Sequence, residues 1–244
     1  MSRTDLASNQ ALTEIKRWPT PRSKGWTARL LNQAADDNNI SAIVAIGSAV
    51  RSGVRSTDLD LVLICTEPSA VHVKPPLEID LRKYRFSELE NEVASGDDVL
   101  GWAVKFGRGL FQRDGCWDAF VGRWHNNVPL PSVGVATQRA QSTLDRLRKV
   151  LEVGDTEAAE EQALSYATHL ARAELLKHGV YPASRPELPG QLRTIGADDA
   201  ADGLAQLIDR SAEHSEQIAT LAATRRLTSA CSRRSPAPSS GRRG

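Results

Sequence analysis

The sequence predicts an α+β protein, in which a small β-sheet with flanking helices is followed by a C-terminal helical bundle. Two short apolar runs, Ile43–Ile46 and Thr57–Ile64, lie on either side of a polar turn and have the length and branched side chains of buried strands. Residues 77–86 alternate between apolar and polar side chains, which is the periodicity of a third strand. Beyond residue 134, apolar residues recur every three to four positions, as they do in helices.

Length, composition and charge exclude several classes of protein. The 244 residues are 40% hydrophobic and carry a formal net charge of +1, which gives no global field to attract nucleic acid or an anionic membrane. No apolar run approaches the roughly 18 residues of a membrane span, and residues 1–20 lack the apolar segment of a signal peptide. The cysteines, Cys65, Cys116 and Cys231, have no metal-type spacing. We therefore expect a reduced, cytoplasmic protein without a membrane partner.

Two helices are expected before the first strand. Asp5–Arg17 is weakly amphipathic, and Pro19 and Pro21 should end it because proline cannot continue a helix. Gly25–Asp36 has an apolar stripe and gives way to a run of Asp and Asn residues just before the strand. A helix therefore precedes the two apolar runs and the turn between them.

Several shorter elements are expected after the third strand, which is assigned to Leu77–Phe86. Ser87 and Glu90 have the spacing of a capping box, which predicts the start of a helix. The glycines around residue 108 should separate a second helix from a short strand. The expected elements are the helix Glu88–Ser95, the helix Asp97–Phe106, the strand Leu110–Arg113 and the helix Cys116–Trp124.

A domain boundary is expected at Asn126–Gly134, where prolines, a glycine and asparagines prevent a helix from continuing. The chain is thus divided into residues 1–134, residues 135–224 and a tail at residues 225–244. The tail is rich in Arg, Ser and Pro and lacks acidic and aromatic residues, so it is expected to be disordered. The second part should contain the helices Val135–Val153, Asp155–His178, a short helix from Ser184, and Asp198–Ala223.

Asp58 and Asp60 are the leading candidates for a functional pair. Side chains at positions i and i+2 of a strand point to the same face, so the two carboxylates should lie side by side. Carboxylates this close repel each other unless a cation lies between them. Oxygen ligands at this spacing suit Mg²⁺, which keeps coordination positions for phosphate oxygens. Gly47 allows the preceding turn to approach a ligand closely.

The stretch Ser41–Ile64 resembles the signature of the DNA polymerase beta-like nucleotidyltransferase superfamily. That signature is an apolar strand, Gly-Ser, a spacer, and then Asp-apolar-Asp-apolar. Here Gly47-Ser48 is followed by nine residues and then by Asp58-Leu59-Asp60-Leu61. The resemblance covers the first half of the chain. It implies a small mixed β-sheet, one or two Mg²⁺ ions held by Asp58 and Asp60, and a nucleoside triphosphate at Gly47 and Ser48.

The resemblance also implies a third carboxylate on the next strand. Asp80 is the best match, and Glu78 on the same face of the strand is its rival. A salt bridge from Asp80 to a nearby Arg is the competing structural interpretation. In the functional interpretation, Asp80 completes the metal site and acts as a general base on the acceptor hydroxyl.

Several basic residues are candidates for contact with phosphate. Arg51 and Arg55 lie in the turn between the first two strands, where a role at the surface is equally compatible with the sequence. Further along the chain the candidates are Lys105, Arg108 and Arg113, for which a solvated surface position is favoured.

The helical half is similar in its pattern to the helical domain of aminoglycoside nucleotidyltransferases and of nucleotidyltransferase–HEPN proteins. Five residues separate Arg172 from His178, which falls within the Arg-x4–6-His spacing of HEPN ribonucleases. Ala173 stands where that motif usually has a polar residue, which favours a structural role for both. His169, on the same expected helix, is also assigned a structural or surface role.

Together these features predict a metal-dependent nucleotidyltransferase. ATP or another nucleoside triphosphate would donate a nucleoside monophosphate, expected to be AMP, to a hydroxyl acceptor, with release of pyrophosphate. The acceptor is left open among a small molecule, a protein and an RNA end. One alternative is a non-catalytic or antitoxin-like protein that keeps the fold and acts by binding a partner. Another is a nucleic-acid-binding protein that relies on the basic tail.

Overall fold

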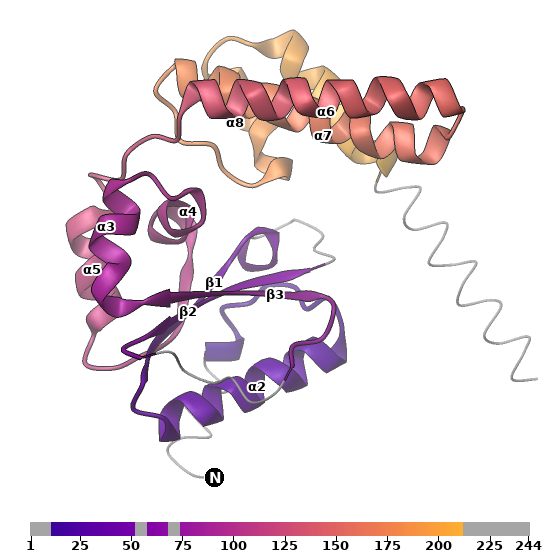
Figure 1. The fold of residues 1–244 in the computed structure, drawn as a ribbon. Coiled ribbons are helices and arrows are strands. Elements are labelled where there is room, and N and C mark those ends of the chain that lie inside the picture. The colour runs from indigo at the N-terminus through magenta and orange to yellow at the C-terminus, as the bar shows by residue number, and fades with distance from the viewer. Residues whose placement is uncertain (1–10, 52–57, 68–73, 212–244) are drawn as a thin grey trace, which may run out of the picture.

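The computed structural model describes residues 11–51, 58–67 and 74–211. Within these residues the chain forms a small β-sheet with helices on both faces, and a layer of further helices lies across this unit (Figure 1). The α+β class predicted from the sequence is confirmed. Among the described helices, none is both long and apolar enough to cross a membrane.

The sheet is mixed and has four strands in the order β3-β2-β1-β4. β1 is antiparallel to both of its neighbours, whereas β2 and β3 are parallel. Every residue of β1 is buried, as its continuous apolar sequence predicts for a central strand. The strands are β1 (Ile40–Ile46), β2 (Leu59–Cys65), β3 (Ile79–Arg85) and β4 (Arg108–Gln112).

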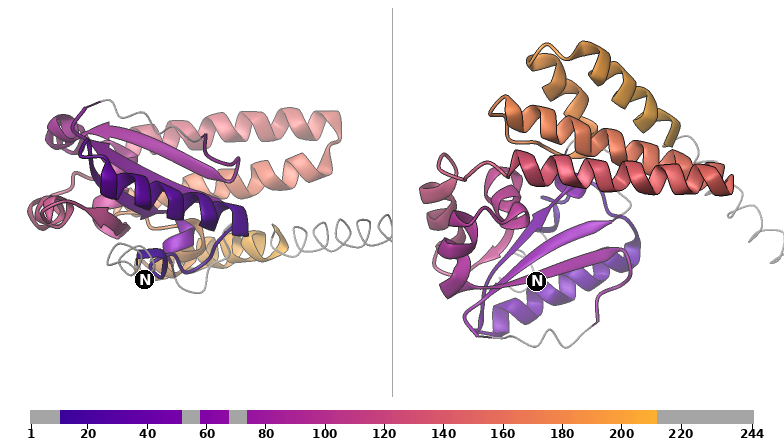
Figure 2. Two further views of the ribbon diagram at one scale, coloured as in Figure 1. Left: turned by 90° about the horizontal axis from the view of Figure 1, so that it is seen from below. Right: turned by 45° about the horizontal axis from the view of Figure 1, so that its top comes forward.

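Helices cover both faces of the sheet and give it two apolar cores. Helix α2 (Pro21–Asp36) packs on one face, where its buried side chains meet alternate residues of β1 and β2. The helices α3 (Leu89–Ala94), α4 (Asp98–Phe106) and α5 (Cys116–Trp124) pack on the other face (Figure 2). The central strands are therefore buried on both faces, and polar side chains gather where those strands begin or end.

The helical layer begins at residue 133. Helices α6 (Val133–Val153) and α7 (Thr156–Lys177) pair along their lengths, and α8 (Leu188–Thr194) packs against α7. Residues 198–211 are helical up to the end of the described segment. A separate apolar cluster holds α7, α8 and this last helix together. The division into domains at residues 126–134 stays a prediction, and the tail lies outside the described residues.

Several local expectations differ from the structure. Helix α2 begins at Pro21 instead of Gly25, and Thr20 caps it. Proline is tolerated at the first helical position because the N–H that it lacks would have no partner within the helix. The capping box at Ser87 does not form, since Glu88 precedes α3 and caps it without a side-chain hydrogen bond. Leu77, assigned to the third strand, lies fully exposed in a turn before β3. Of the first expected helix, only residues 11–17 are described, and only 11 and 12 are helical.

Candidate functional site

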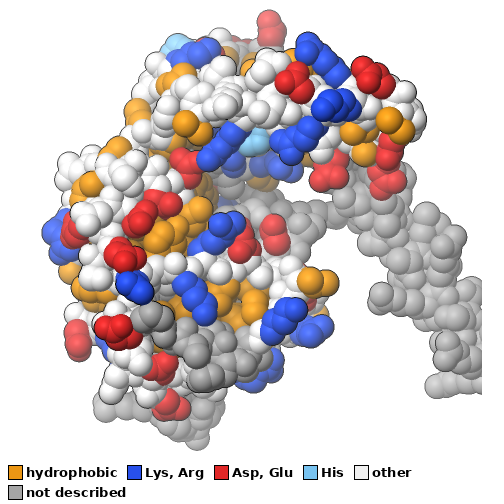
Figure 3. Space-filling model, in the orientation of Figure 1, with side chains coloured by type: hydrophobic (Ala, Val, Ile, Leu, Met, Phe, Trp, Pro, Cys, Tyr) orange, Lys and Arg blue, Asp and Glu red, His pale blue; other side chains and the backbone are white. Residues whose placement is uncertain are grey.

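A cavity of about 730 Å³ lies between the sheet and the helical layer, and Figure 3 shows the hollow at the molecular surface. Its sheet wall consists of the end of β1, the turn after it, and the first residues of β2 and β3. Its helical wall consists of α6, α7 and residues 181–186, and α4 lines the space between the two walls. The volume lies within the range of about 300–1,000 Å³ that ligand pockets have.

Gly47 forms the turn at the centre of the sheet wall. Its φ of 78° lies in the left-handed region, which residues with a side chain rarely adopt. A Cβ at this position would lie 2.5 Å from Oδ2 of Asp60. Glycine is therefore required both by the backbone and by the close approach of the Asp60 carboxylate. Ser48 follows in a short 3₁₀ helix, Ser48–Val50, and lines the cavity.

Asp60 is the central carboxylate of the sheet wall. It is on β2 between Leu59 and Leu61, which are buried in the core against α2. Asp80 is its register partner on the parallel strand β3, and Asp58 directly precedes β2. All three carboxylates line the cavity. Burial, and then repulsion from Asp58 and Asp80, raises the pKa of Asp60 from 3.8 to about 6.

The two candidates for the third carboxylate have different surroundings. Asp80 lines the cavity and accepts a hydrogen bond from Nη2 of Arg82, 2.9 Å away. The competing salt bridge is therefore present, although both side chains are about half exposed. Glu78 precedes β3 and accepts a hydrogen bond from the Thr20 hydroxyl, which caps α2. Glu78 is not part of the cavity lining, so the geometry favours Asp80.

The sheet wall is chemically suited to a divalent cation. Among the described residues, no three Asp, Glu, His or Cys side chains gather closely enough to hold a metal ion by themselves. Mg²⁺, however, is often held by one or two carboxylates together with phosphate oxygens and water. Asp58 and Asp60 supply this donor type, with Asp80 beside them. Burial raises the pKa of Asp60 most, and the negative charges of Asp58 and Asp80 raise it further; a bound cation would favour the ionised carboxylate against both.

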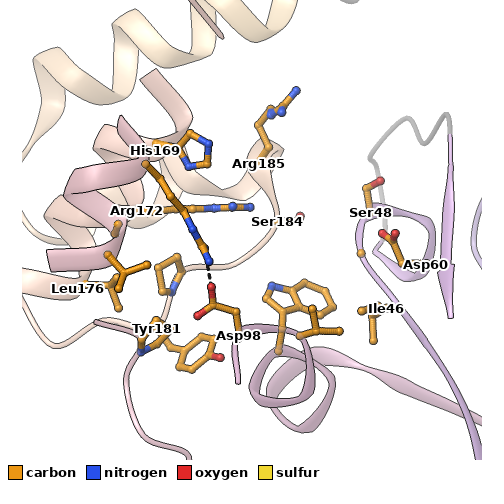
Figure 4. Close-up of a pocket in the computed structure, with 18 of the residues that line it drawn as sticks. Ile46, Ser48, Asp60, Asp98, His169, Arg172, Leu176, Tyr181, Ser184 and Arg185 are labelled. Carbon is orange, nitrogen blue, oxygen red and sulfur yellow. Dashed lines mark hydrogen bonds and ion pairs between the residues drawn. The ribbon is translucent and has the colours of Figure 1, made fainter. Parts of the chain in front are cut away.

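The helical wall carries four basic side chains. Arg139 is on α6, His169 and Arg172 are on α7, and Arg185 begins the 3₁₀ helix η3 (Arg185–Glu187). Figure 4 shows the His169, Arg172 and Arg185 side chains on the side of the cavity opposite Asp60. The two walls therefore present charge of opposite sign to the same space.

The basic side chains of this wall differ in their partners. Nη1 of Arg139 donates a hydrogen bond to Oδ2 of Asp98 on α4, 2.5 Å away. Within the described part of the chain, the side chains of Arg172 and Arg185 make no hydrogen bond or ion pair. Burial, and then the charge of Arg185, lowers the pKa of Arg172. Burial, and then the charge of Arg172, lowers the pKa of His169. This wall therefore carries positive charge that its own acidic residues do not neutralise.

Arg51 does not line the cavity. Its Nε lies 2.9 Å from Oε1 of Glu187 on η3, and its guanidinium lies over the ring of Phe106. Glu187 also accepts a hydrogen bond from the Ser184 hydroxyl. Arg51 therefore joins the segment after the Gly-Ser turn to the helical layer. Its predicted contact with phosphate stays a prediction, and this geometry gives it no support.

The other predicted phosphate-binding cations also lie away from the cavity lining. Lys105 and Arg108 do not line it, and Arg55 is outside the described residues. Arg113 binds the end of α2 instead, because its guanidinium donates to carbonyl oxygens there. The acceptors of its hydrogen bonds are the main-chain oxygens of Ala34, Ala35, Asp37 and Ile40.

The two residues of the HEPN-like spacing have separate environments. Arg172 lines the cavity, whereas His178 caps the end of α7 with Nε2 3.4 Å from Oε1 of Glu174. The ribonuclease interpretation therefore gains no support. His169, which the sequence assigned to a structural or surface role, instead lines the cavity next to Arg172.

Sequence reasoning missed most of the helical wall. His169 and Arg172 are three residues apart on α7, which places them on one face of the helix and was the available local signal. Arg139 and Arg185 carry no such signal, because they come from different elements. Trp102 on α4, which was not among the predicted site residues, also lines the cavity, with its ring centroid 5.0 Å from that of Phe106.

No protein-family model matches the chain, and no curated protein matches its sequence. Among solved structures, the chain is similar to a nucleotidyltransferase-like protein from Exiguobacterium sibiricum 255-15. The two share 16% sequence identity at a TM-score of 0.37, over 75% of this chain and 66% of that one. The chain thus spans somewhat less than two thirds of the length of this neighbour.

Proposed function

We propose that the protein is a metal-dependent nucleotidyltransferase that moves a nucleoside monophosphate, AMP from ATP, to a hydroxyl acceptor and releases pyrophosphate. The observation that carries this proposal is the position of Asp60. It contacts the turn at Gly47, lies beside Asp58, and pairs in register with Asp80, at the edge of a cavity large enough for a nucleotide. A carboxylate with a raised pKa in a cleft is a candidate for a functional site.

The sheet wall would bind the phosphates of the nucleotide. Gly47 lets the backbone approach them, and Ser48 offers its N–H and hydroxyl as donors. Asp58 and Asp60 would hold Mg²⁺, which, when bound, screens phosphate charge and stabilises the leaving group. Through that ion, the two carboxylates would orient the triphosphate.

Asp80 would remove the proton from the acceptor hydroxyl. Its carboxylate lies on the strand next to Asp60 and lines the cavity, which supports a role close to the reacting groups. Arg82 donates to Oδ2 of Asp80, which holds the carboxylate in place. A general base at such a position typically contributes about 10²–10⁴-fold to the rate.

Titration calorimetry with ATP and Mg²⁺ tests whether the sheet wall binds nucleotide. The full chain should bind, and Asp60→Asn should lose most of the Mg²⁺-dependent affinity. Asp145→Asn is the matched control, because this carboxylate on α6 is exposed and lies outside the cavity lining. Absence of ATP binding by the unaltered protein would overturn the proposal and favour a partner-binding role.

Labelled ATP tests the reaction itself. With ATP labelled at the α-phosphorus and a cell extract, the label should pass to an acceptor. With ATP labelled at the γ-phosphorus, it should appear in pyrophosphate. Transfer of the γ-label to the acceptor would identify a kinase and contradict nucleotidyl transfer.

A further inference from the structure

The helical wall of the cavity holds more positive charge than the acidic residues beside it neutralise. Arg172 lines the cavity and is partly buried, and its side chain makes no hydrogen bond or ion pair within residues 11–51, 58–67 and 74–211. Arg185 is near enough to lower the pKa of Arg172, so the two guanidinium groups repel each other. Placing like charges together in a partly desolvated cavity is costly, and a bound anion would remove that cost.

The acidic residues around the cavity do not meet this need. Asp98 attracts Arg172 and acts to raise its pKa, but its carboxylate forms an ion pair with Arg139, and Asp80 forms one with Arg82. Figure 4 shows Asp60 on the far side of the cavity from Arg172 and pointing toward the Gly-Ser turn. The charge of the helical wall is therefore left for a ligand to neutralise.

We propose that Arg172 and Arg185, with His169 beside them, form an anion-binding subsite for the acceptor, so that the acceptor carries a phosphate or carboxylate group. The assignment to the acceptor rests on the proposed function, which places the phosphates of the nucleotide on the opposite wall at Gly47 and Ser48. Guanidinium groups suit this task because their fixed donors match the oxygens of phosphate and carboxylate. A polycationic acceptor such as an aminoglycoside would be repelled by this wall.

Titration of the full chain with inorganic phosphate tests the subsite directly. Phosphate should bind, and Arg172→Gln and Arg185→Gln should each weaken its binding by about tenfold or more, because each removes a charged donor. Arg123→Gln is the matched control. Arg123 is exposed on α5, pairs with Glu90 and lies outside the cavity lining, so phosphate affinity should stay within about twofold. Thermal melting of each variant confirms that it is folded.

A second titration separates the acceptor from the nucleotide as the source of the anion. Phosphate is added to protein already saturated with Mg²⁺ and a non-hydrolysable ATP analogue. Unchanged phosphate affinity supports an acceptor subsite. Displacement of phosphate by the analogue overturns this assignment, because the arginines would then bind the phosphates of the nucleotide.

The remaining outcomes are also decisive. If the unaltered protein binds no phosphate, or if Arg123→Gln weakens binding as much as Arg172→Gln does, the subsite is overturned and the proposed function is unaffected. If phosphate binds through Arg172 but no ATP binds with Mg²⁺, the proposed function fails, and the assignment to an acceptor fails with it.

Discussion

The two walls of the cavity carry opposite charge and are built in different ways. The sheet wall presents short carboxylates from adjacent strands, where the ladder between β2 and β3 fixes the spacing of Asp60 and Asp80. The helical wall presents long side chains from α7 and η3, whose ends can adjust. Short acids at a fixed spacing suit a small hard cation. Long guanidinium groups suit the larger oxygen-bearing group of a ligand that can vary in shape.

The opposed charges are more typical of a ligand-binding cavity than of a plain structural interface. Ion pairs that join the two sides of the cavity do exist, as between Arg139 and Asp98, and between Arg51 and Glu187 beyond its lining. The charges of Asp60 and Arg172 remain on opposite sides instead (Figure 4). Such separation is costly in the protein alone, so it is expected where a ligand provides the missing charges.

The largest expected effect tests whether the sheet wall performs the chemistry. Asp58→Asn or Asp60→Asn should lower nucleotidyl transfer by about 10³-fold or more, because each removes one of the two charges that would hold the cation. Transfer from α-labelled ATP measures the effect, with Asp145→Asn as the control. Near-normal transfer by either variant would show that this pair does not hold a catalytic cation, and would contradict the assignment of the chemistry to the sheet wall.

The next effect ranks the acids within the sheet wall. Asp80→Ala should slow transfer by about 10²-fold or more, because it removes the proposed general base. ATP affinity should fall less, since Asp58 and Asp60 remain. Glu78→Ala is the matched variant and should be milder, because Glu78 binds Thr20 outside the cavity lining. The ranking is wrong if Glu78→Ala proves to be the inactive variant.

A smaller effect concerns the stability cost of the Asp60 carboxylate, which is partly buried and lies beside Asp58 and Asp80. The pKa of Asp60 is raised to about 6 in the folded state, so its ionised form opposes folding. This destabilisation is absent below about pH 4, grows as the pH rises to 6, and is complete above it. Without divalent cations, Asp60→Asn should therefore raise the free energy of unfolding by about 1–2 kcal/mol above pH 6, after allowance for solvent screening.

Thermal melting in EDTA between pH 3.5 and 8 checks the sign of this effect. The gain in Tm from Asp60→Asn should disappear at the acidic end. Asp118→Asn serves as the control, because Asp118 is exposed on α5 and outside the cavity lining. An equal gain at every pH would show that the substitution acts through packing instead of charge.

The smallest expected effect concerns the ion pair between Arg51 and Glu187, which joins the segment after the Gly-Ser turn to the helical layer. The side chains of Arg51 and Glu187 are 25% and 28% exposed, so their ion pair is partly screened by solvent. A double-mutant cycle with Arg51→Gln and Glu187→Gln should give a coupling energy of about 1 kcal/mol in urea unfolding. ATP affinity should change little. A large loss of ATP binding in Arg51→Gln alone would instead favour the predicted role of Arg51 at phosphate.

The sheet wall could be predicted from sequence because its residues are close together along the chain. Strand alternation placed Asp58 and Asp60 on one face, and the Gly-Ser turn marked where the backbone approaches them. The third acid was harder to assign. Alternation alone allowed both Glu78 and Asp80; the structure separates them, because Asp80 lies on β3 and lines the cavity, whereas Glu78 precedes β3 and binds Thr20.

The helical wall could not be assembled from sequence in the same way. Helical periodicity predicts which face of α7 is apolar, but it does not predict which element that face meets. Arg139, Arg172 and Arg185 come together only through the packing of α6 and α7 and the turn of η3. Arg113 was misread for the same reason, since its partners lie more than 70 residues earlier in the chain.

The hydrogen bonds of Arg113 to the end of α2 couple the local unfolding of two segments that lie far apart in the sequence. The guanidinium follows β4 in the chain and binds carbonyl oxygens at the end of α2, up to 79 residues away. The last turn of α2 is therefore completed only when β4 has paired with β1. In native-state hydrogen exchange, amides at the end of α2 and in β4 should then open together as one cooperative unit.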